Sequence, residues 1–559
     1  MKRIFILAIS AFCVLSTSAA QWPTGQWQAQ IADKLVSINI TEVNDTGLLL
    51  VLDSATANPQ AQSFIYVNDT KTLAQSQTDS QHYLKLTSFG DLIFQITDES
   101  STGKTKNAFL KPVLSDIKTL NDYPTAQAIS ELPNANTWLS YVNQDLWKFW
   151  GTDNATKFVS YRCNNGNLPD PTNLCRELRD GWISAGLEND YTRMVSRQVF
   201  TYGVIFNMTG NTQALEYMRN GVDILLARFE TNGSAATIMR DGKPLYVAEQ
   251  RTSQDLAYVQ VGLAMAYYLT GDDLILAKIN GLREFVLNNY YRDDWQMLAW
   301  TLKDQMPGDS NNQELVAQLD QLNAYMLLMY PHLPESQKPA WEKDIRLIVD
   351  TLLDKFHNQE NNRFAGQIVR GKYNRPGERH NDFGHSVKTY WMIYTAGKLL
   401  NDKTYLDTGR WGIDKIINQA IRFREQPRGY SNWGNQTNSN NSSWWEFAEL
   451  TQATATLALE NPDYSRYLPD IYNMWLNNFV DKTYGGVWPS ANGGAKQHLW
   501  KNGYHESEIG LVALITTQKI KAEPFELYFA RNSGHFQPYL FSYDAVSMTT
   551  DNGISKVEF

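Results

Sequence analysis

The chain has 559 residues, which predicts roughly two to four domains or one large repeat-built domain. Hydrophobic residues make up 43% and charged residues 19%, so a wholly disordered or collagen-like protein is excluded. The formal net charge is -9 at pH 7 without a cluster of Lys and Arg, which argues against a nucleic-acid partner. Aromatic residues make up 12%, and their flat amphipathic surfaces suit carbohydrate ligands as well as cores.

Residues 1–20 have the pattern of a secretory signal peptide. Lys2 and Arg3 precede an apolar run at 4–15, and small residues at 18–20 precede Gln21. We therefore expect cleavage after residue 20 and a periplasmic or secreted protein. No later stretch approaches the roughly 18 uninterrupted apolar residues of a membrane span, so we expect none in the mature chain.

Two cysteines remain after this cleavage. Cys163 and Cys175 lie twelve positions apart in a loop-like stretch, and in an exported protein such a pair most simply forms one disulfide. We interpret it as a staple within the loop. A catalytic thiol is the alternative, but no residue nearby suggests a base for it.

Residues 21–115 have a β-like pattern. Short apolar runs at 35–40, 47–52, 63–67, 83–87 and 91–96 are separated by clusters of Gly, Asn, Asp and Ser. This predicts an antiparallel sandwich or small barrel, which we treat as a β-sandwich-like domain followed by a linker at 116–135. We expect the domain to be a structural cap without chemistry of its own.

From residue 136 the apolar spacing becomes helical. Leu256, Val259 and Leu263 lie on one helix face before a turn at Gly271, and Ile275 opens the next apolar stripe. Similar breaks recur about every 60 residues, at Gly210, Gly271, Leu333-Pro334, Asn401 and Asn461-Pro462.

Counting the helices around these breaks, with one at 138–150 and one at 505–518, gives twelve. The sequence therefore predicts a mainly α fold, an (α/α)6 toroid or barrel at 136–522. The tail at 523–559 is predicted to be extended and to pack on the β domain.

Polar side chains recur at nearly one height of the first helix in each hairpin. They are Arg197, Asp255, Asp320, His385 and Glu449. Equal heights on successive inner helices converge at one end of a toroid, where a concave site can form. Helix N-terminal turns favour acidic residues in any case, so Arg197 and His385 carry more of this inference.

The sharpest motifs lie between residues 381 and 505. They are Gly384-His385 followed by Trp391, Trp444-Trp445-x-x-Ala448-Glu449, Gly485-Gly486-x-Trp488, and Trp500-Lys501-x-x-Tyr504-His505. This set resembles the N-acylglucosamine 2-epimerase superfamily, which includes cellobiose 2-epimerases and aldose–ketose isomerases. The family's early Gln-x-Arg is matched by Arg197 without the Gln. The resemblance covers roughly residues 136–520 and implies an (α/α)6 barrel.

The resemblance implies cofactor-free, metal-free proton transfer beside the carbonyl of a mono-, di- or oligosaccharide. It places His385 and His505 as the acid/base pair and Arg197 at the developing oxyanion. An imidazole titrates near neutral pH, and a guanidinium can stabilise an enolate oxygen. The residues that the resemblance places against the sugar are Trp444, Trp445, Glu449, Asp320, Trp391, Trp500 and Tyr504. The oligomeric state is not indicated.

Three positions depart from the family pattern. Asp320 stands in place of a histidine, Asn323 in place of a glutamate, and Lys388 in place of another glutamate. These positions orient or polarise the substrate, so the substrate, and with it the reaction, can differ from those of the characterised members.

Two further function classes stay open. In a glycoside hydrolase, an inverting pair of carboxylates roughly 6.5–9.5 Å apart would be drawn from Asp320, Asp382, Glu449, Glu506 and Glu508. A polysaccharide lyase would use a His or Tyr, with Arg197 neutralising a uronate, and the α/α toroid hosts both classes. A glycan-binding protein without catalysis would use the aromatic residues as platforms.

One histidine near the motifs is given no role. His380 and His385 are five positions apart, which is not the spacing of a helical metal pair, and His380 is predicted to be a loop residue.

Overall fold

The computed structural model describes two parts of the chain. The first is eight strands, with a few adjoining residues, between 25 and 112. The second is 124–530 except 153–157, 159–160, 171, 247–250, 303–311, 359–361, 376–377, 421–442 and 491–492. The predicted signal peptide lies outside the described residues. The chain divides into two compact units, residues 1–117 and 118–559, and each is considered by itself.

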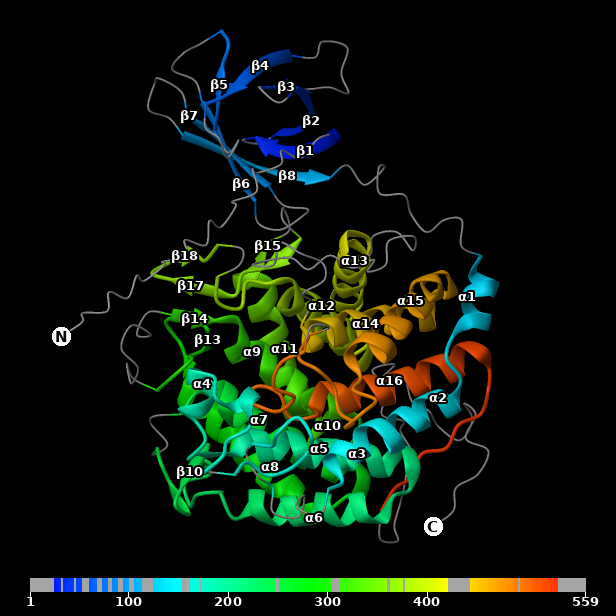
Figure 1. Ribbon diagram of the computed structural model, residues 1–559. Helices are drawn as coiled ribbons and strands as arrows, with labels where there is room; N and C mark the ends of the chain where they lie inside the picture. Colours follow the sequence, from blue (N-terminus) through cyan, green and yellow to red (C-terminus); the bar gives the residue numbers. More distant parts are fainter. Residues whose placement is uncertain are drawn as a thin grey trace, which may run out of the picture. The chain divides into compact units, whose positions relative to one another are not determined.

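The first unit is a closed antiparallel barrel (Figure 1). Each strand pairs with the next along the chain, and β1 closes the sheet on β8. Closure leaves no strand edge open to another chain. A sandwich and a barrel share the same alternation of apolar and polar residues, so the predicted sandwich-like domain is instead one closed sheet. Its strands are β1 (Gly25–Ile31), β2 (Lys34–Asn44), β3 (Gly47–Leu52), β4 (Gln60–Tyr66), β5 (Leu73–Ser76), β6 (Tyr83–Ser88), β7 (Phe94–Glu99) and β8 (Thr105–Pro112).

The second unit is built from helix hairpins. Its inner helices are α5 (Thr192–Thr209), α7 (Ser253–Thr270), α9 (Leu315–Gln321) continued by the π-helical turn η7 (Leu322–Met326) and α10 (Leu327–Met329), α12 (Phe383–Leu399), α14 (Trp444–Glu460) and α16 (Tyr504–Lys521). Its outer helices are α6 (Thr212–Leu226), α8 (Asp273–Tyr290), α11 (Lys338–Thr351), α13 (Lys403–Ala420), α15 (Leu468–Met474) and the segment from α2 (Ala135–Ser140) to α3 (Trp147–Trp150).

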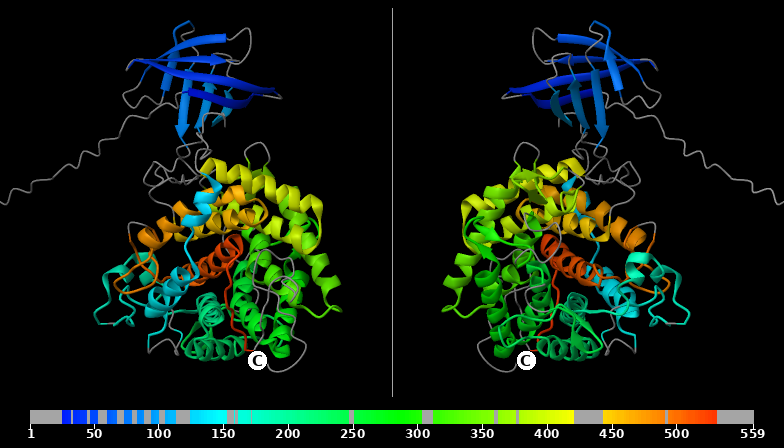
Figure 2. Two further views of the ribbon diagram at one scale, coloured as in Figure 1. Left: turned by 90° about the vertical axis from the view of Figure 1, so that its right-hand side faces the viewer. Right: turned by 90° about the vertical axis from the view of Figure 1, so that its left-hand side faces the viewer.

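The inner helices form a closed ring. Figure 2 shows the helical unit from two further sides. Each packs on the next, and α16 packs on α5, so the chain ends of the unit meet. Nearly every residue of α5, α7 and α14 is buried, whereas α6 and α11 each keep one exposed face. The prediction of a mainly helical (α/α)6 toroid is confirmed.

The hairpin turns lie where the sequence predicts them. Gly210 and Gly271 end α5 and α7 in the left-handed conformation, with φ of 68° and 66°, which glycine adopts without steric cost. Asn211 and Asp272 then cap the following helices. Each hairpin therefore returns the chain to the same end of the ring, so all inner helices begin there.

Two predicted connections differ in the structure. The linker at 116–135 contains a helix, α1 (Thr125–Glu131), which packs against α15 and α16. The described start of the C-terminal tail lies on the helical unit, because Tyr528 N donates to Asn207 O and Ala530 N donates to Leu269 O. The rest of the tail, 531–559, lies outside the described residues. Among the helices that the structure describes, none is long and apolar enough to cross a bilayer.

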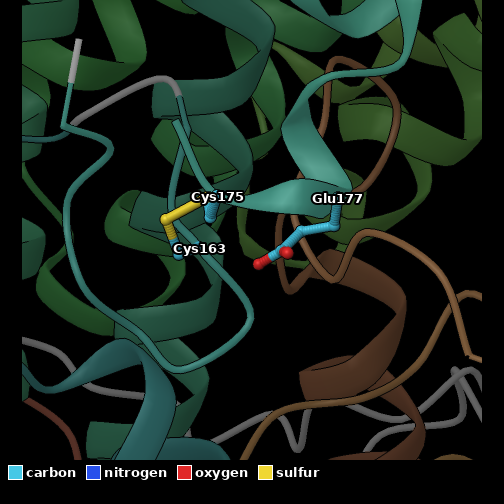
Figure 3. A group of neighbouring side chains, drawn as sticks. All are labelled: Cys163, Cys175 and Glu177. Atoms are coloured by element: carbon cyan, nitrogen blue, oxygen red, sulfur yellow. A yellow bond between two sulfur atoms is a disulfide. The ribbon is translucent and has the colours of Figure 1, made fainter. Parts of the chain in front are cut away.

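A disulfide joins Cys163 and Cys175, as predicted, and Figure 3 shows Glu177 beside it. The two sulfur atoms are bonded to each other, so this group of three side chains does not offer thiolates to a metal ion. Within the stapled loop, the side-chain amide of Asn164 donates to Gly494 O at 3.0 Å, and the backbone carbonyl of Asn164 accepts from Lys496 Nζ at 2.8 Å. The loop thereby holds the segment that leads into α16.

Candidate active site

Predicted site residues gather where the inner helices begin. Each lies within the first six residues of its helix: Arg197 on α5, Asp320 on α9, His385 on α12, Trp445 and Glu449 on α14, and His505 on α16. Since all these helices begin at one end of the ring, their side chains meet at that end.

His385 forms a dyad with the N-cap residue of its own helix. Asp382 Oδ1 accepts from the backbone N of His385 at 2.9 Å, and Oδ2 lies 2.7 Å from the ring Nδ1. Burial acts to raise the pKa of Asp382, but the charge and hydrogen bonds of His385 lower it below its usual value. Asp382 is therefore a carboxylate that holds Nδ1, which leaves Nε2 of His385 to face a substrate.

His505 is the second imidazole, and its side chain is 8% exposed. Its Nδ1 lies 3.6 Å from Glu449 Oε1 and 3.7 Å from Glu508 Oε2, too far for hydrogen bonds in this arrangement. Burial lowers the pKa of His505 to about 4, although Glu508 acts in the opposite direction. The ring is therefore neutral near pH 7.

The indole of Trp445 links the two histidines. Its ring centroid lies 4.8 Å from that of His385 and 6.5 Å from that of His505. The two imidazoles come from inner helices on either side of α14, and they lie against the same aromatic ring. A half-buried indole between two imidazoles is a surface on which a sugar can stack.

Glu449 is fully buried, and within the described part of the chain neither carboxyl oxygen has a hydrogen-bond partner. Burial raises the pKa of Glu449 well above its usual value, while Lys388 opposes and Glu508 adds to the shift. Glu449 therefore keeps its proton at pH values where an exposed glutamate has lost it.

Two of the departures from the family pattern form one buried ion pair. Lys388 Nζ lies 2.8 Å from Asp320 Oδ1. Gln254 Nε2 donates to Asp320 Oδ2 at 2.6 Å, and Tyr258 OH donates to Oδ1 at 3.2 Å. Burial acts to raise the pKa of Asp320, but Lys388, Gln254 and His385 together outweigh it and the pKa falls to about 2. The negative charge of Asp320 is thus neutralised by Lys388.

Arg197 is buried and held by its neighbours. Its Nη1 donates to Trp500 O at 3.0 Å, and its guanidinium carbon lies 4.0 Å from the centroid of the Tyr258 ring. Its Nε is buried and has no hydrogen-bond partner within the described residues. Trp500, 45% exposed, has Arg193 over its ring at 4.3 Å.

Polar residues close the ring deeper along the helices. Asn323 Nδ2 and Tyr504 OH, from opposite inner helices, lie 3.4 Å apart. Tyr504 OH also donates to Glu508 Oε1 at 3.1 Å, and Gln452 Nε2 donates to Glu508 Oε2 at 3.2 Å. These contacts link the third, fifth and sixth inner helices through buried polar side chains.

Two predicted sugar-binding residues lie away from the histidines. Trp391 is fully buried between α12 and α14, where its Nε1 donates to Thr456 Oγ1 at 3.0 Å. Six residues beyond His385, it lies on a different face of the helix. Trp444 lies beside His498, at 5.6 Å between ring centroids, and under the Nζ of Lys501.

Several contributing residues are not predicted from the sequence. Gln254 and Tyr258 are one turn apart on α7, and the neighbouring Asp255 is the residue that the repeat selects. Asp255 instead pairs with Arg193 at 2.9 Å. Gln254 and Tyr258 have the i, i+4 spacing that places two side chains on one helix face, and their helix also bears Asp255. This spacing is the signal that could have identified them.

His380 lies in the loop before α12, as predicted, but next to the site. Its ring centroid is 5.0 Å from that of His385. Its Nδ1 lies 3.2 Å from an oxygen of Glu314, a fully buried residue at the end of the short strand β14 (Asn312–Glu314). Neither residue belongs to a sequence motif that marks it.

Comparisons with known proteins concern the fold of the helical unit. No family model matches the chain, and no curated protein matches it. The structure of a D-mannose isomerase matches with a TM-score of 0.56 and 14% identity, covering 68% of this chain and 97% of that chain. A cellobiose 2-epimerase from Spirochaeta thermophila matches with a TM-score of 0.55 and 16% identity, covering 69% and 97%.

A cellobiose 2-epimerase from Bacillus thermoamylovorans matches with a TM-score of 0.54 and 14% identity, covering 69% of this chain and 99% of that chain. At such identities the likeness concerns the fold alone. The helical unit of this chain has the fold of these sugar isomerases and epimerases.

Proposed function

We propose that this chain is a sugar 2-epimerase or aldose–ketose isomerase that moves a proton beside the carbonyl of a ring-opened sugar. The observation that carries the proposal is the placement of His385 and His505 against one indole, that of Trp445, at the end of the ring where Arg197 holds a buried Nε without a partner among the described residues. The shared fold of D-mannose isomerase and the cellobiose 2-epimerases supports it.

In the first half-reaction, His385 removes the proton from C2. Asp382 fixes the ring through Nδ1, so Nε2 is the accepting atom, and its carboxylate stabilises the imidazolium that forms. The electron pair of the C–H bond moves toward the carbonyl oxygen and gives an enediolate. Arg197 Nε donates to that oxygen, where a guanidinium stabilises the developing charge.

In the second half-reaction, carbon regains a proton through His505. A neutral imidazole that gave up its own proton would become an imidazolate, which is costly. Glu449 can supply a second proton to the ring, because it is protonated and its Oε1 lies 3.6 Å from His505 Nδ1. As Nε2 gives its proton to carbon, Nδ1 takes the proton of Glu449, and His505 stays neutral. Such distances commonly shorten when a substrate binds.

The destination of the proton decides the product. Return to C2 from the opposite face inverts that carbon and gives the epimer. Delivery to C1, with the hydroxyl proton of O2 passing to O1, gives the ketose.

The hydrolase alternative is supported less well, because most of its carboxylates have other partners. Asp320 is paired with a lysine, Asp382 with a histidine, and Glu506 with Lys501. Glu449 and Glu508 both approach the same nitrogen of His505. Asp320, Asp382 and Glu506 are thereby paired with a cation or an imidazole, and Glu449 has a raised pKa, so these four lack the environment of a general base that activates water.

The test is incubation with a panel of mono- and disaccharides in D2O, followed by proton NMR. We expect deuterium at C2, or at C1 of a ketose, without chain cleavage. New reducing ends or unsaturated products would overturn the proposal. His385→Asn should slow the exchange by about 10²- to 10⁴-fold. His332→Asn, at a turn between α10 and α11, is the matched control and should exchange at the wild-type rate.

A further inference from the structure

A buried carboxylate stands beside the proposed site without a role in the mechanism. Glu314 is fully buried, at the point where β14 runs into α9. Gln367 Nε2 donates to its Oε1 at 2.6 Å, Arg379 Nε lies 3.5 Å from Oε1, and His380 Nδ1 lies 3.2 Å from Oε2. Burying the charge of Glu314 costs free energy unless the charge is paired. The carboxylate therefore holds its partners, His380 among them, close to it.

The loop that carries His380 is fixed as well. His380 has a φ of 57°, a left-handed backbone conformation that is uncommon outside glycine. A Cβ on Gly366 would lie 2.2 Å from the carbonyl carbon of His380, so only glycine permits this approach. Asn374 Nδ2 also donates to Arg379 O at 2.8 Å. Strand β14 pairs with β17 (Gln367–Val369). This strand pair and the loop that follows it thus determine where the imidazole of His380 lies.

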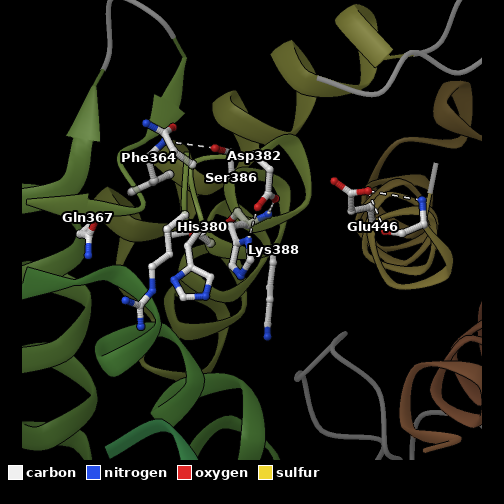
Figure 4. A network of polar contacts seen from close by, with 12 residues as sticks. Phe364, Gln367, His380, Asp382, Ser386, Lys388 and Glu446 are labelled. Carbon is white, nitrogen blue, oxygen red and sulfur yellow. Dashed lines mark hydrogen bonds and ion pairs between the residues drawn. The ribbon is translucent and has the colours of Figure 1, made fainter. Parts of the chain in front are cut away.

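The imidazole of His380 lies at the edge of the proposed site. Its centroid is 5.0 Å from that of His385 and 6.3 Å from the ring of Trp300, and its side chain is 23% exposed. Figure 4 shows it beside Asp382 and Lys388 at the start of α12. Because Nδ1 faces Glu314, Nε2 is the ring nitrogen that can meet a ligand.

We propose that His380 is a third imidazole of the sugar site, a substrate-binding residue whose Nε2 hydrogen-bonds a sugar oxygen next to the carbon on which His385 acts. Glu314 is the positioning residue that fixes the orientation of its ring. This inference rests on the proposed function for the identity of the ligand, and it adds a residue that the motifs do not contain. The ligand group is a hydroxyl or carbonyl oxygen, since an imidazole nitrogen can donate to or accept from either.

Two substitutions of His380 in the full chain separate a structural from a ligand-binding role. In His380→Asn the amide nitrogen takes the place of Nδ1 and can keep the bond to Glu314. In His380→Gln the amide reaches the place of Nε2. We expect His380→Asn to lower kcat/KM by about 10- to 100-fold, mainly through KM, as for a lost hydrogen bond that leaves its partner unpaired. We expect His380→Gln to stay within about tenfold of wild type.

Urea unfolding midpoints equal to wild type show that both variants fold. Wild-type kcat/KM in His380→Asn would overturn the proposal. Glu314→Gln tests the positioning role, with the His380 ring followed by nitrogen-15 NMR. We expect the ring to lose its fixed tautomer and its pKa to fall, because Glu314 raises it. An unchanged tautomer and pKa would overturn that role.

The comparison uses whichever sugar the wild-type chain binds or turns over. If that sugar is cleaved rather than epimerised or isomerised, the proposed function fails, while the comparison of the His380 variants still decides this inference. If the wild-type chain binds no sugar of the panel, both fail.

Discussion

At the scale of single residues, Asp320 and Lys388 depart from the family pattern for one reason, which is that they form an ion pair with each other. Asp320 and Lys388 are 68 positions apart, and each alone would place an unpaired charge in the site. Together they form a buried pair that Gln254 and Tyr258 complete. Sequence motifs identify both positions, but they do not show that the two charges meet. That requires the register of α9 against α12.

We predict that Lys388→Met destabilises the protein by about 3–5 kcal/mol, because it leaves the charge of Asp320 buried without its partner. Urea unfolding at pH 7 measures this. The control is Lys403→Met, which removes the same charge from an exposed ion pair with Asp407, where the side chain of Lys403 is 85% exposed, and should cost at most about 1 kcal/mol.

The double variant Lys388→Met with Asp320→Asn should regain most of the loss. If Lys388→Met proved no more costly than Lys403→Met, the ion pair would not carry the stability assigned to it.

A second prediction at this scale concerns Glu449, which we propose as the source of the returning proton. Glu449→Gln cannot supply that proton, whereas His385 and Asp382 remain intact. We expect C2 exchange with solvent to continue while formation of the epimer or ketose falls by about 10²-fold or more. Proton NMR in D2O follows both events in one sample. Loss of exchange and product in equal measure would contradict the assigned order.

At the scale of elements, the repeat of about 60 residues predicts the hairpins, because glycine and asparagine mark the turns and the apolar stripes mark the faces. Short strands such as β14 and β17, of three residues each, leave too little pattern to be predicted. They position Glu314 and His380, which explains why the sequence does not identify this part of the site. The π-helical turn within the third inner helix is likewise unmarked.

The packing of α5 against α7 positions Arg197 and gives an element-scale prediction. A Cβ on Gly262 of α7 would lie 2.3 Å from Ser196 O on α5. Gly262→Ala must therefore separate the two helices, and we expect a loss of about 1–3 kcal/mol together with lower activity through displaced Arg197.

The matched control is Gly281→Ala on α8, where a Cβ meets nothing within 4 Å. There the substitution should stabilise the helix by about 0.5–1 kcal/mol. Thermal unfolding and exchange rates of both variants check this. A Gly262→Ala variant as stable and active as wild type would mean that the helices are not in close contact.

At the scale of the whole molecule, closure of the inner ring brings the side chains of the candidate site together. One series of contacts passes once around the ring: Arg197 to Tyr258, Gln254 to Asp320, Asp320 to Lys388, His385 to Trp445, Glu449 to His505, and Trp500 back to Arg197. The motifs identify the tryptophan and imidazole members of this series. They miss the α7 members, because amide and phenol side chains are common on buried helices.

The stability of the whole chain should depend on pH through the buried groups of this ring. His505 has a pKa of about 4 when folded, against about 6.5 in an unfolded chain. Between these values the unfolded state binds more protons, so His505 lowers stability as pH falls from about 6.5 to 4, by ~3 kcal/mol in all. Glu449 acts oppositely: its raised pKa makes stability fall as pH rises above about 4.5.

We predict that His505→Gln loses less stability than wild type between pH 7 and 4.5, and that Glu449→Gln loses less between pH 5 and 8. Urea unfolding across this range measures both slopes, with His332→Gln as the control that keeps the wild-type profile. The two groups change different parts of the plot of unfolding free energy against pH. Removing a buried imidazole makes the plot flatter at acid pH, and removing a buried acid makes it flatter at alkaline pH. Parallel profiles for wild type and His505→Gln would mean that the pKa of His505 is the same in the folded and the unfolded chain, so burial would not be what keeps the proposed carrier between Glu449 and carbon neutral.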